Sequence, residues 1–168
     1  RELAEAGLAG IDWAARMNAA SVLILKKRQN FYYFFGVDNL QTFGALNDPQ
    51  LFTPIAPTAL WNAAATTAES IYEDIRRLFV QLQLQCQGTI DQQTPMTLAL
   101  SPEISVALNK TNAFNVNVRD NLTKNFPNLR IETAVEYATV SGQLVQLIAD
   151  SIEGVETATC VYTDMMRA

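Results

Sequence analysis

The residues able to do chemistry in this chain are few, and their types exclude the most familiar catalytic arrangements. The sequence contains no histidine, which removes the commonest general base and the commonest metal ligand. Ser-His-Asp and Cys-His arrangements therefore cannot form within it. Two distant cysteines, Cys86 and Cys160, are too few for a zinc site, and no glycine-rich phosphate loop occurs. We predict no catalytic, cofactor-binding or metal-binding residues.

Acidic side chains are the remaining candidates for acid–base chemistry. The closest pairs are Glu73–Asp74 and Asp150–Glu153. Acid–base catalysis also needs a cleft and a shifted pKa, and each pair fits a solvated helix face or a turn. These acids nevertheless leave one functional hypothesis open. The chain would be a cytosolic α+β domain that binds or hydrolyses a small molecule, with Asp74 or Asp150 in a cleft.

The charge balance indicates contact with proteins more than with nucleic acid. Charged residues make up 17% of the chain and the net charge is −5, whereas about 25% charged residues is usual. A dedicated nucleic-acid binder is normally basic. The single basic run, Lys26–Arg28, has two interpretations: cations at the C-terminal end of a helix, or contact with nucleic acid or an acidic neighbour. No run of 18 apolar residues predicts a membrane span.

Five consecutive aromatic residues follow a helical pattern that runs from about residue 11 to residue 29, and Gly36 ends the aromatic run. Consecutive side chains cannot all face one way. We expect alternate rings to face inward and the others to meet another chain. An extended region follows, with a turn at Asn47, Asp48 and Pro49. The aromatic residues are Phe31, Tyr32, Tyr33, Phe34 and Phe35.

The strongest helical pattern runs from Thr66 to Gly88, with Thr66 and Glu69 spaced as a capping box and Gly88 as the C-cap. Apolar residues recur at helical spacing and predict its core face. We expect this core to contain Ile71, Ile75, Leu78, Phe79 and Leu82.

The remaining chain alternates strand and helix patterns. Residues 96–100 form a short apolar run, and Ser101 with Pro102 then predicts a helix start. A second short helix is predicted over residues 118–125, and a strand over the segment LRIETAVEYA. Two further strands, QLVQLIAD and VETATCVYTDMM, flank a turn at Gly154. The order of elements predicts an α+β fold.

The segments KKRQNFYYFFGV, GALNDP, MTLALSP, NFPNLRIETAVEYA and GVETATCVYTDMMRA occur in this order. Together they resemble the major capsid proteins of tailed bacteriophages and prophages. The resemblance implies the Hong Kong 97-like α+β capsid fold, which has a long spine helix, a peripheral lobe and a mixed axial lobe. The lobes would be residues 1–94 (peripheral), 95–155 (axial) and 156–168 (the return towards the peripheral lobe).

The function implied by the resemblance is that of a structural virion protein that self-assembles into an icosahedral shell around phage DNA, and not that of an enzyme. The implied partners are copies of itself, scaffold and portal proteins, and packaged DNA held without specificity, but no membrane. The implied locations are the virion and, during assembly, the host cytoplasm. Since such sequences continue at both ends, we expect this chain to be a fragment. The candidate assembly interface comprises Phe31, Tyr32, Tyr33, Phe34, Phe35, Asn47, Asp48 and Pro49.

Overall fold

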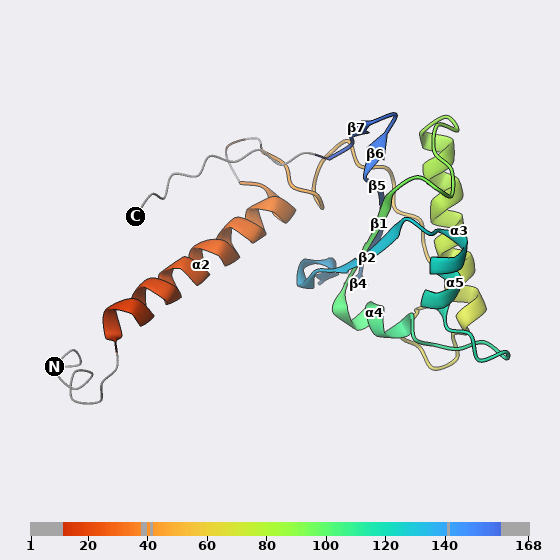
Figure 1. Ribbon diagram of the computed structural model, residues 1–168, viewed down its shortest axis with the longest axis horizontal. Helices are drawn as coiled ribbons and strands as arrows, with labels where there is room; N and C mark the ends of the chain where they lie inside the picture. Colours follow the sequence, from red (N-terminus) through yellow and green to blue (C-terminus); the bar gives the residue numbers. More distant parts are fainter. Residues whose placement is uncertain (1–11, 38–39, 41, 141, 159–168) are drawn as a thin grey trace. The chain divides into compact units, whose positions relative to one another are not determined.

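The computed structural model describes residues 12–37, 40, 42–140 and 142–158 (Figure 1). Its mixture of helices and strands confirms the α+β class. Two compact units divide the chain, Arg1–Thr53 and Pro54–Ala168. The three-part division into capsid lobes stays a prediction.

The first unit is built on helix α2 (Trp13–Phe35). Asp12 caps its start, because the side chain accepts a 3.0 Å hydrogen bond from the backbone N–H of Ala15. The expectation that the helix ends near Gln29 was wrong. It continues through all five aromatic residues, since the first residue that favours a helix end is Gly36, with φ +68°.

This extension also corrects the helix-end interpretation of the basic run. Lys26, Lys27 and Arg28 lie inside α2, and its last turn contains no basic residue. Arg28 instead lies over the rings of Phe31 and Tyr32, with its guanidinium carbon 5.4 Å and 5.1 Å from the ring centroids. Such cation–π contacts are attractive, so Arg28 belongs to the aromatic cluster.

The second unit contains a three-stranded sheet in the order β2-β1-β5. Strands β1 (Met96–Leu100) and β2 (Leu129–Thr133) are parallel, and β5 (Val145–Ala149) is antiparallel to β1. The register places Leu98 between Ile131 and Leu147. Because side chains alternate along a strand, one face of the sheet is apolar and belongs to the core.

Helix α3 (Ala68–Gln85) supplies the other large part of this core. Its N-cap is Thr67, which accepts a hydrogen bond from the backbone N–H of Ser70, and not Thr66 as the capping-box pattern predicted. The buried Thr66 hydroxyl donates instead to the Leu60 carbonyl at 2.7 Å. At the other end, Gly88 (φ +79°) follows the helix and donates its N–H to the Gln83 carbonyl.

The predicted core residues of α3 lie at different depths. Ile71 and Ile75 are 0% and 1% exposed, and Phe79 is also buried. Leu82 is partly buried and packs against the core cluster. Leu78 is half-buried and does not belong to this cluster.

Two short helices connect β1 to β2, as predicted. Helix α4 (Pro102–Ala107) begins after Ser101, whose hydroxyl accepts the Ile104 N–H, and Pro102 occupies the first turn. Helix α5 (Val118–Asn125) lies beside α3 in Figure 1. Phe126, directly after α5, packs edge-on against Phe79 of α3 at a centroid distance of 5.0 Å.

Short elements complete the unit: a 3-10 turn η1 (Val135–Tyr137) and strands β3 (Ala138–Thr139), β4 (Gly142–Gln143), β6 (Ser151–Ile152) and β7 (Val155–Glu156). Gly154 lies in the turn between β6 and β7, as predicted. Of the expected strand VETATCVYTDMM, the part that the structure describes forms β7 at its start. The residues from 159 onward, Cys160 among them, lie outside the described residues.

Candidate assembly surface

The C-terminal end of α2 is closed by the segment that follows it. The last four carbonyls of a helix have no partner inside the helix. Here each of them accepts a hydrogen bond from a later residue. The bonds run from Gly36 N–H to the Tyr32 carbonyl (2.8 Å), from Ala45 N–H to Tyr33 (3.0 Å), from Leu46 N–H to Phe34 (3.0 Å) and from Asn47 Nδ2 to Phe35 (2.7 Å).

Two glycines allow this close approach. A Cβ atom at Gly36 would lie 2.0 Å from the carbonyl oxygen of Thr42, and one at Gly44 would lie 2.3 Å from the carbonyl carbon of Phe34. Both distances are too short for any side chain. The glycines of FFG and TFG are therefore required for the segment to fold back onto the helix end.

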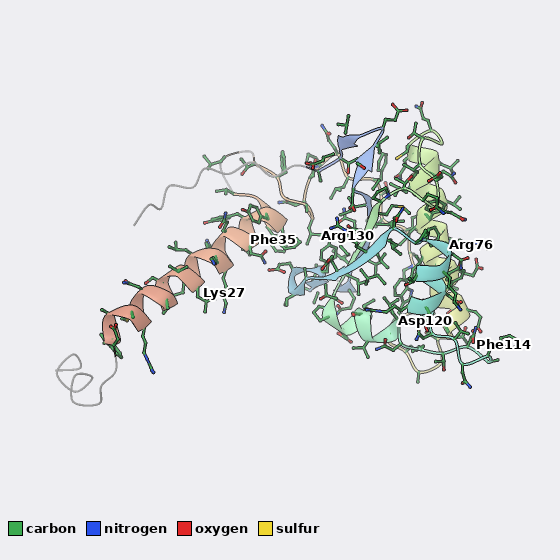
Figure 2. All side chains as sticks on the ribbon, viewed as in Figure 1. Lys27, Phe35, Arg76, Phe114, Asp120 and Arg130 are labelled. Carbon is green, nitrogen blue, oxygen red and sulfur yellow. The ribbon has the colours of Figure 1, made fainter. Side chains whose placement is uncertain are left out.

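The five aromatic residues are the last five residues of α2, and Figure 2 labels the last of them, Phe35. Phe31 and Tyr32 are exposed, at 42% and 37%, whereas Tyr33, Phe34 and Phe35 are half-buried. The rings of Phe31 and Phe35, one helical turn apart, have centroids 4.8 Å apart. The expected alternation of inward and outward rings is thus wrong, because the segment is helical and its exposed rings are adjacent in sequence.

The predicted turn contributes most directly through Asn47. Its side chain donates to the Phe35 carbonyl and accepts the Gly44 N–H at 2.7 Å. Asp48 accepts the Gln50 N–H at 2.8 Å and so stabilises the turn itself, while Pro49 is exposed. The structure therefore brings this turn and the aromatic run together within one unit.

No residue of α2 is buried, although the helix carries many apolar side chains. Most helical stability in proteins comes from packing of an apolar face, and large contiguous exposed apolar patches are typical of interaction sites in general. The exposed large apolar side chains of α2 are Trp13, Met17, Val22, Leu23, Ile24, Leu25, Phe31 and Tyr32.

In the second unit, Asp74 of α3 forms hydrogen bonds with the segment that precedes this helix. It is 6% exposed and accepts hydrogen bonds from the Thr58 hydroxyl (2.6 Å), the Thr58 N–H (3.0 Å) and Trp61 Nε1 (2.9 Å). Burial alone would raise the pKa of Asp74, but the hydrogen bonds from Thr58 and Trp61, helped by Arg77, lower it. Asp74 is therefore a structural carboxylate whose oxygens are occupied.

Lys110 also holds this segment, a role that no sequence pattern indicated. Its ammonium group donates to the carbonyls of Trp61 (2.9 Å), Ala63 (2.6 Å) and Thr66 (3.0 Å). An ammonium group has three donors and no acceptor capacity. Lys110 therefore satisfies three backbone acceptors with one side chain.

Asp150 lies at an open hollow of about 530 Å³, but its carboxylate is paired. Arg130 NH2 lies 2.9 Å from one oxygen, and the Thr97 hydroxyl donates to the other at 2.7 Å. The hollow is lined by Pro95, Pro127, Asn128, Leu129, Arg130, Asp150, Ser151 and Glu156. Among the described residues, no group of three acidic or cysteine side chains could hold a metal ion, and no helix is long and apolar enough to cross a membrane.

Comparison with protein families matches the Pa193 gp26 major capsid protein model to residues 1–168, the whole chain. The chain belongs to the Pa193 gp26 major capsid protein family. Among solved structures, a chain from the capsid of Myoviridae phage XM1 is similar in fold, with a TM-score of 0.69 and 17% sequence identity. The match covers 84% of this chain and 49% of that one, so this chain spans about half the length of the XM1 protein. No curated protein matches the sequence.

Membership in the gp26 major capsid protein family confirms the resemblance based on the sequence segments. It also supports the prediction that the chain is a structural capsid subunit, and it does not favour the alternative of a domain that binds or hydrolyses a small molecule. The two acids of that alternative, Asp74 and Asp150, both form structural hydrogen bonds. The assignment of the aromatic run and the Asn47 turn to an assembly interface stays a prediction. No sequence pattern indicated the role of Lys110 or the closure of α2 by residues 42–47.

Proposed function

We propose that this protein is the self-assembling subunit of an icosahedral shell that encloses phage DNA. The observation that carries the proposal is the family match, which extends over every residue of the chain. The fold shared with a subunit of the XM1 capsid supports it. A structural role without enzymatic activity follows from the same family.

The aromatic end of α2 and the turn at Asn47 to Pro49 are the surface that we assign to contact with a neighbouring subunit. Phe31 and Tyr32 offer exposed rings, and Arg28 stacks on both of them. Aromatic residues and arginine are enriched where protein interfaces are most buried. The capping hydrogen bonds hold these rings on a closed helix end, which reduces the entropy lost on association.

The spine-helix core is the second part of the proposal. We assign α3 as the spine helix. Of its predicted core residues, Ile71, Ile75 and Leu82 would hold the peripheral lobe of the subunit together while its surface contacts change from one neighbour to the next, and half-buried Leu78 lies outside the core cluster. The same subunit would meet its neighbours through broad, weak, repeated interfaces whose combined avidity closes the shell. Contacts between different surfaces of identical subunits form rings when the rotation closes.

Further partners follow from the same role. Scaffold and portal proteins would contact the subunit during assembly in the host cytoplasm, and packaged DNA would meet its inner face in the virion. With a net charge of −5, the contact with DNA would be non-specific and weak, because affinity for phosphates depends on clustered cations.

Negative-stain electron microscopy of the full-length gene product, expressed alone and together with its neighbouring genes, tests the proposal. Uniform large particles are the expected result. A variant with both exposed rings removed, Phe31→Ser with Tyr32→Ser, should remain folded and fail to form particles. Only monomers and small oligomers of the wild type, under every condition tried, would refute the function.

A further inference from the structure

The loop between α4 and α5 carries an exposed aromatic residue that is far in sequence from the aromatic end of α2. Phe114 is 85% exposed, the highest value among the exposed aromatic side chains of the described residues. Figure 2 shows it at the tip of this loop, pointing away from the rest of its unit. A phenyl ring gains free energy when it is removed from water, so burial of this ring by a partner would be favourable.

The loop is ordered by its own hydrogen bonds, and the exposure is therefore not the result of a loose chain. Asn112 Oδ1 accepts the N–H groups of Phe114 (2.9 Å) and Val116 (3.0 Å), and the Asn112 N–H donates to the Val116 carbonyl (3.0 Å). Asn115 adopts the left-handed conformation (φ +57°) that the reversal needs. The ring is thus presented on a fixed turn.

The base of the loop is fastened as well. Thr111 and Asn117 form an antiparallel bridge, and the N–H of Val118 donates to the Lys110 carbonyl at 3.2 Å. Lys110 itself binds the three carbonyls of the segment before α3. A group that is already held in place loses little entropy when it binds a partner.

The surroundings of Phe114 indicate which class of partner it meets. Residues 111–117 read TNAFNVN and contain no charge. An aromatic residue among uncharged polar neighbours is typical of the centre of a protein–protein interface. Binding to nucleic acid or to a membrane surface would favour a free lysine or arginine beside the ring. Residues 111–117 contain neither, and the ammonium group of Lys110 at the base of the loop is bound to three backbone carbonyls.

We propose that Phe114 is an anchor that inserts into an apolar surface of a second copy of this chain. This inference rests on the proposed function, and it adds a contact remote in sequence from the aromatic end of α2. One phenylalanine buries about 200 Å², whereas a stable pairwise interface buries about 1,600 Å² in total. A contact this small is effective where many copies repeat it, as in a shell.

The role of Phe114 is tested by measuring particle assembly of three full-length variants. They are Phe114→Ser, Phe114→Leu and Ala113→Ser. All three should melt at the wild-type temperature, because positions 113 and 114 are both exposed in the subunit. Phe114→Ser should lower the particle yield at least tenfold, while Phe114→Leu should restore part of it and Ala113→Ser should assemble like the wild type. Wild-type particle yield from Phe114→Ser would overturn the anchor while leaving the proposed function intact. A wild-type protein that never assembles would overturn both.

A photo-crosslinking phenylalanine analogue at position 114 of the full-length protein, activated in assembled particles, identifies the partner. The expected product is a covalent dimer in which the ring is joined to a peptide from another copy of the chain. Crosslinks to a different protein, or no crosslink in assembled particles, would overturn the assignment of a second copy.

Discussion

The side-chain amide of Asn47 donates a 2.7 Å hydrogen bond to the backbone carbonyl of Phe35, twelve residues earlier in the chain. The same side chain accepts the N–H of Gly44. One asparagine thus satisfies the last carbonyl of α2 and fixes the shape of the segment that closes the helix.

Replacing Asn47 by alanine should loosen this closure. Both hydrogen bonds are lost, and because Asn47 is exposed we expect a cost of about 1 kcal/mol in local stability. Hydrogen exchange measures the effect: protection of the Ala45 and Leu46 amides should fall about fivefold. Asp48→Ala is the matched control and should leave these two amides protected. Unchanged protection in Asn47→Ala would show that the backbone bonds alone close the helix.

Ile75→Asp should unfold the second unit. The side chain is 1% exposed within the core, and a buried unpaired carboxylate costs about 4 kcal/mol or more. Urea unfolding measures the loss. Leu84→Asp on the same helix is the control, since Leu84 is 67% exposed and its replacement should change stability by less than about 0.5 kcal/mol. Equal losses from the two variants would contradict the assigned core face.

Asp74→Asn should destabilise the same unit by about 2 kcal/mol at pH 7, because one amide cannot accept hydrogen bonds at both of its polar atoms. The pKa of Asp74 is lowered in the folded protein. The carboxylate therefore contributes stability above its unfolded pKa of about 3.9, and this contribution is lost as the pH falls through the lower folded pKa.

The difference between wild type and Asp74→Asn should accordingly shrink in urea titrations as the pH is lowered below 4. Glu73→Gln, on the exposed side of α3, serves as the control and should resemble the wild type at each pH. A difference that stays constant down to the lowest accessible pH would show that the charge of Asp74 does not stabilise the fold.

Lys110→Met should cost about 2 kcal/mol, because it leaves the carbonyls of Trp61, Ala63 and Thr66 without their shared donor. Limited proteolysis should then cut the segment before α3 sooner than in the wild type. Lys124→Met, at an exposed lysine of α5, is the control. Resistance equal to the wild type would mean that Asp74 alone secures the segment.

What the sequence predicted well depends on local signals. Ser101 and Pro102 mark the start of α4 because capping needs only a few adjacent residues. The stripe through Ile71 and Ile75 identifies the buried face of α3 because helical spacing repeats within the helix. Strand β1 and the turn at Gly154 were predicted for the same reason.

What the sequence did not predict depends on contacts between distant residues. The aromatic run has side chains common in strands, yet the preceding helix extends through it to Gly36. Asp74 resembles a solvated acid beside Glu73, although its position three residues after Ile71 places it on the buried side of α3. The hydrogen-bond partners of Asp74, Thr58 and Trp61, lie in the irregular chain before α3. The carbonyls that Lys110 binds lie in the same irregular chain, which carries no periodic signal.

The two units differ in how far apart in the chain their contacts lie. The closure of α2 joins residues 12 positions apart, whereas the contact between Thr97 and Asp150 in the second unit spans 53 positions. Closing a short loop costs less entropy than closing a long one, and local contacts form sooner during folding. During synthesis the ribosome makes every residue that closes α2, the last being Asn47, long before it makes β5, so a nascent chain holds all the residues of that surface while its sheet is still incomplete.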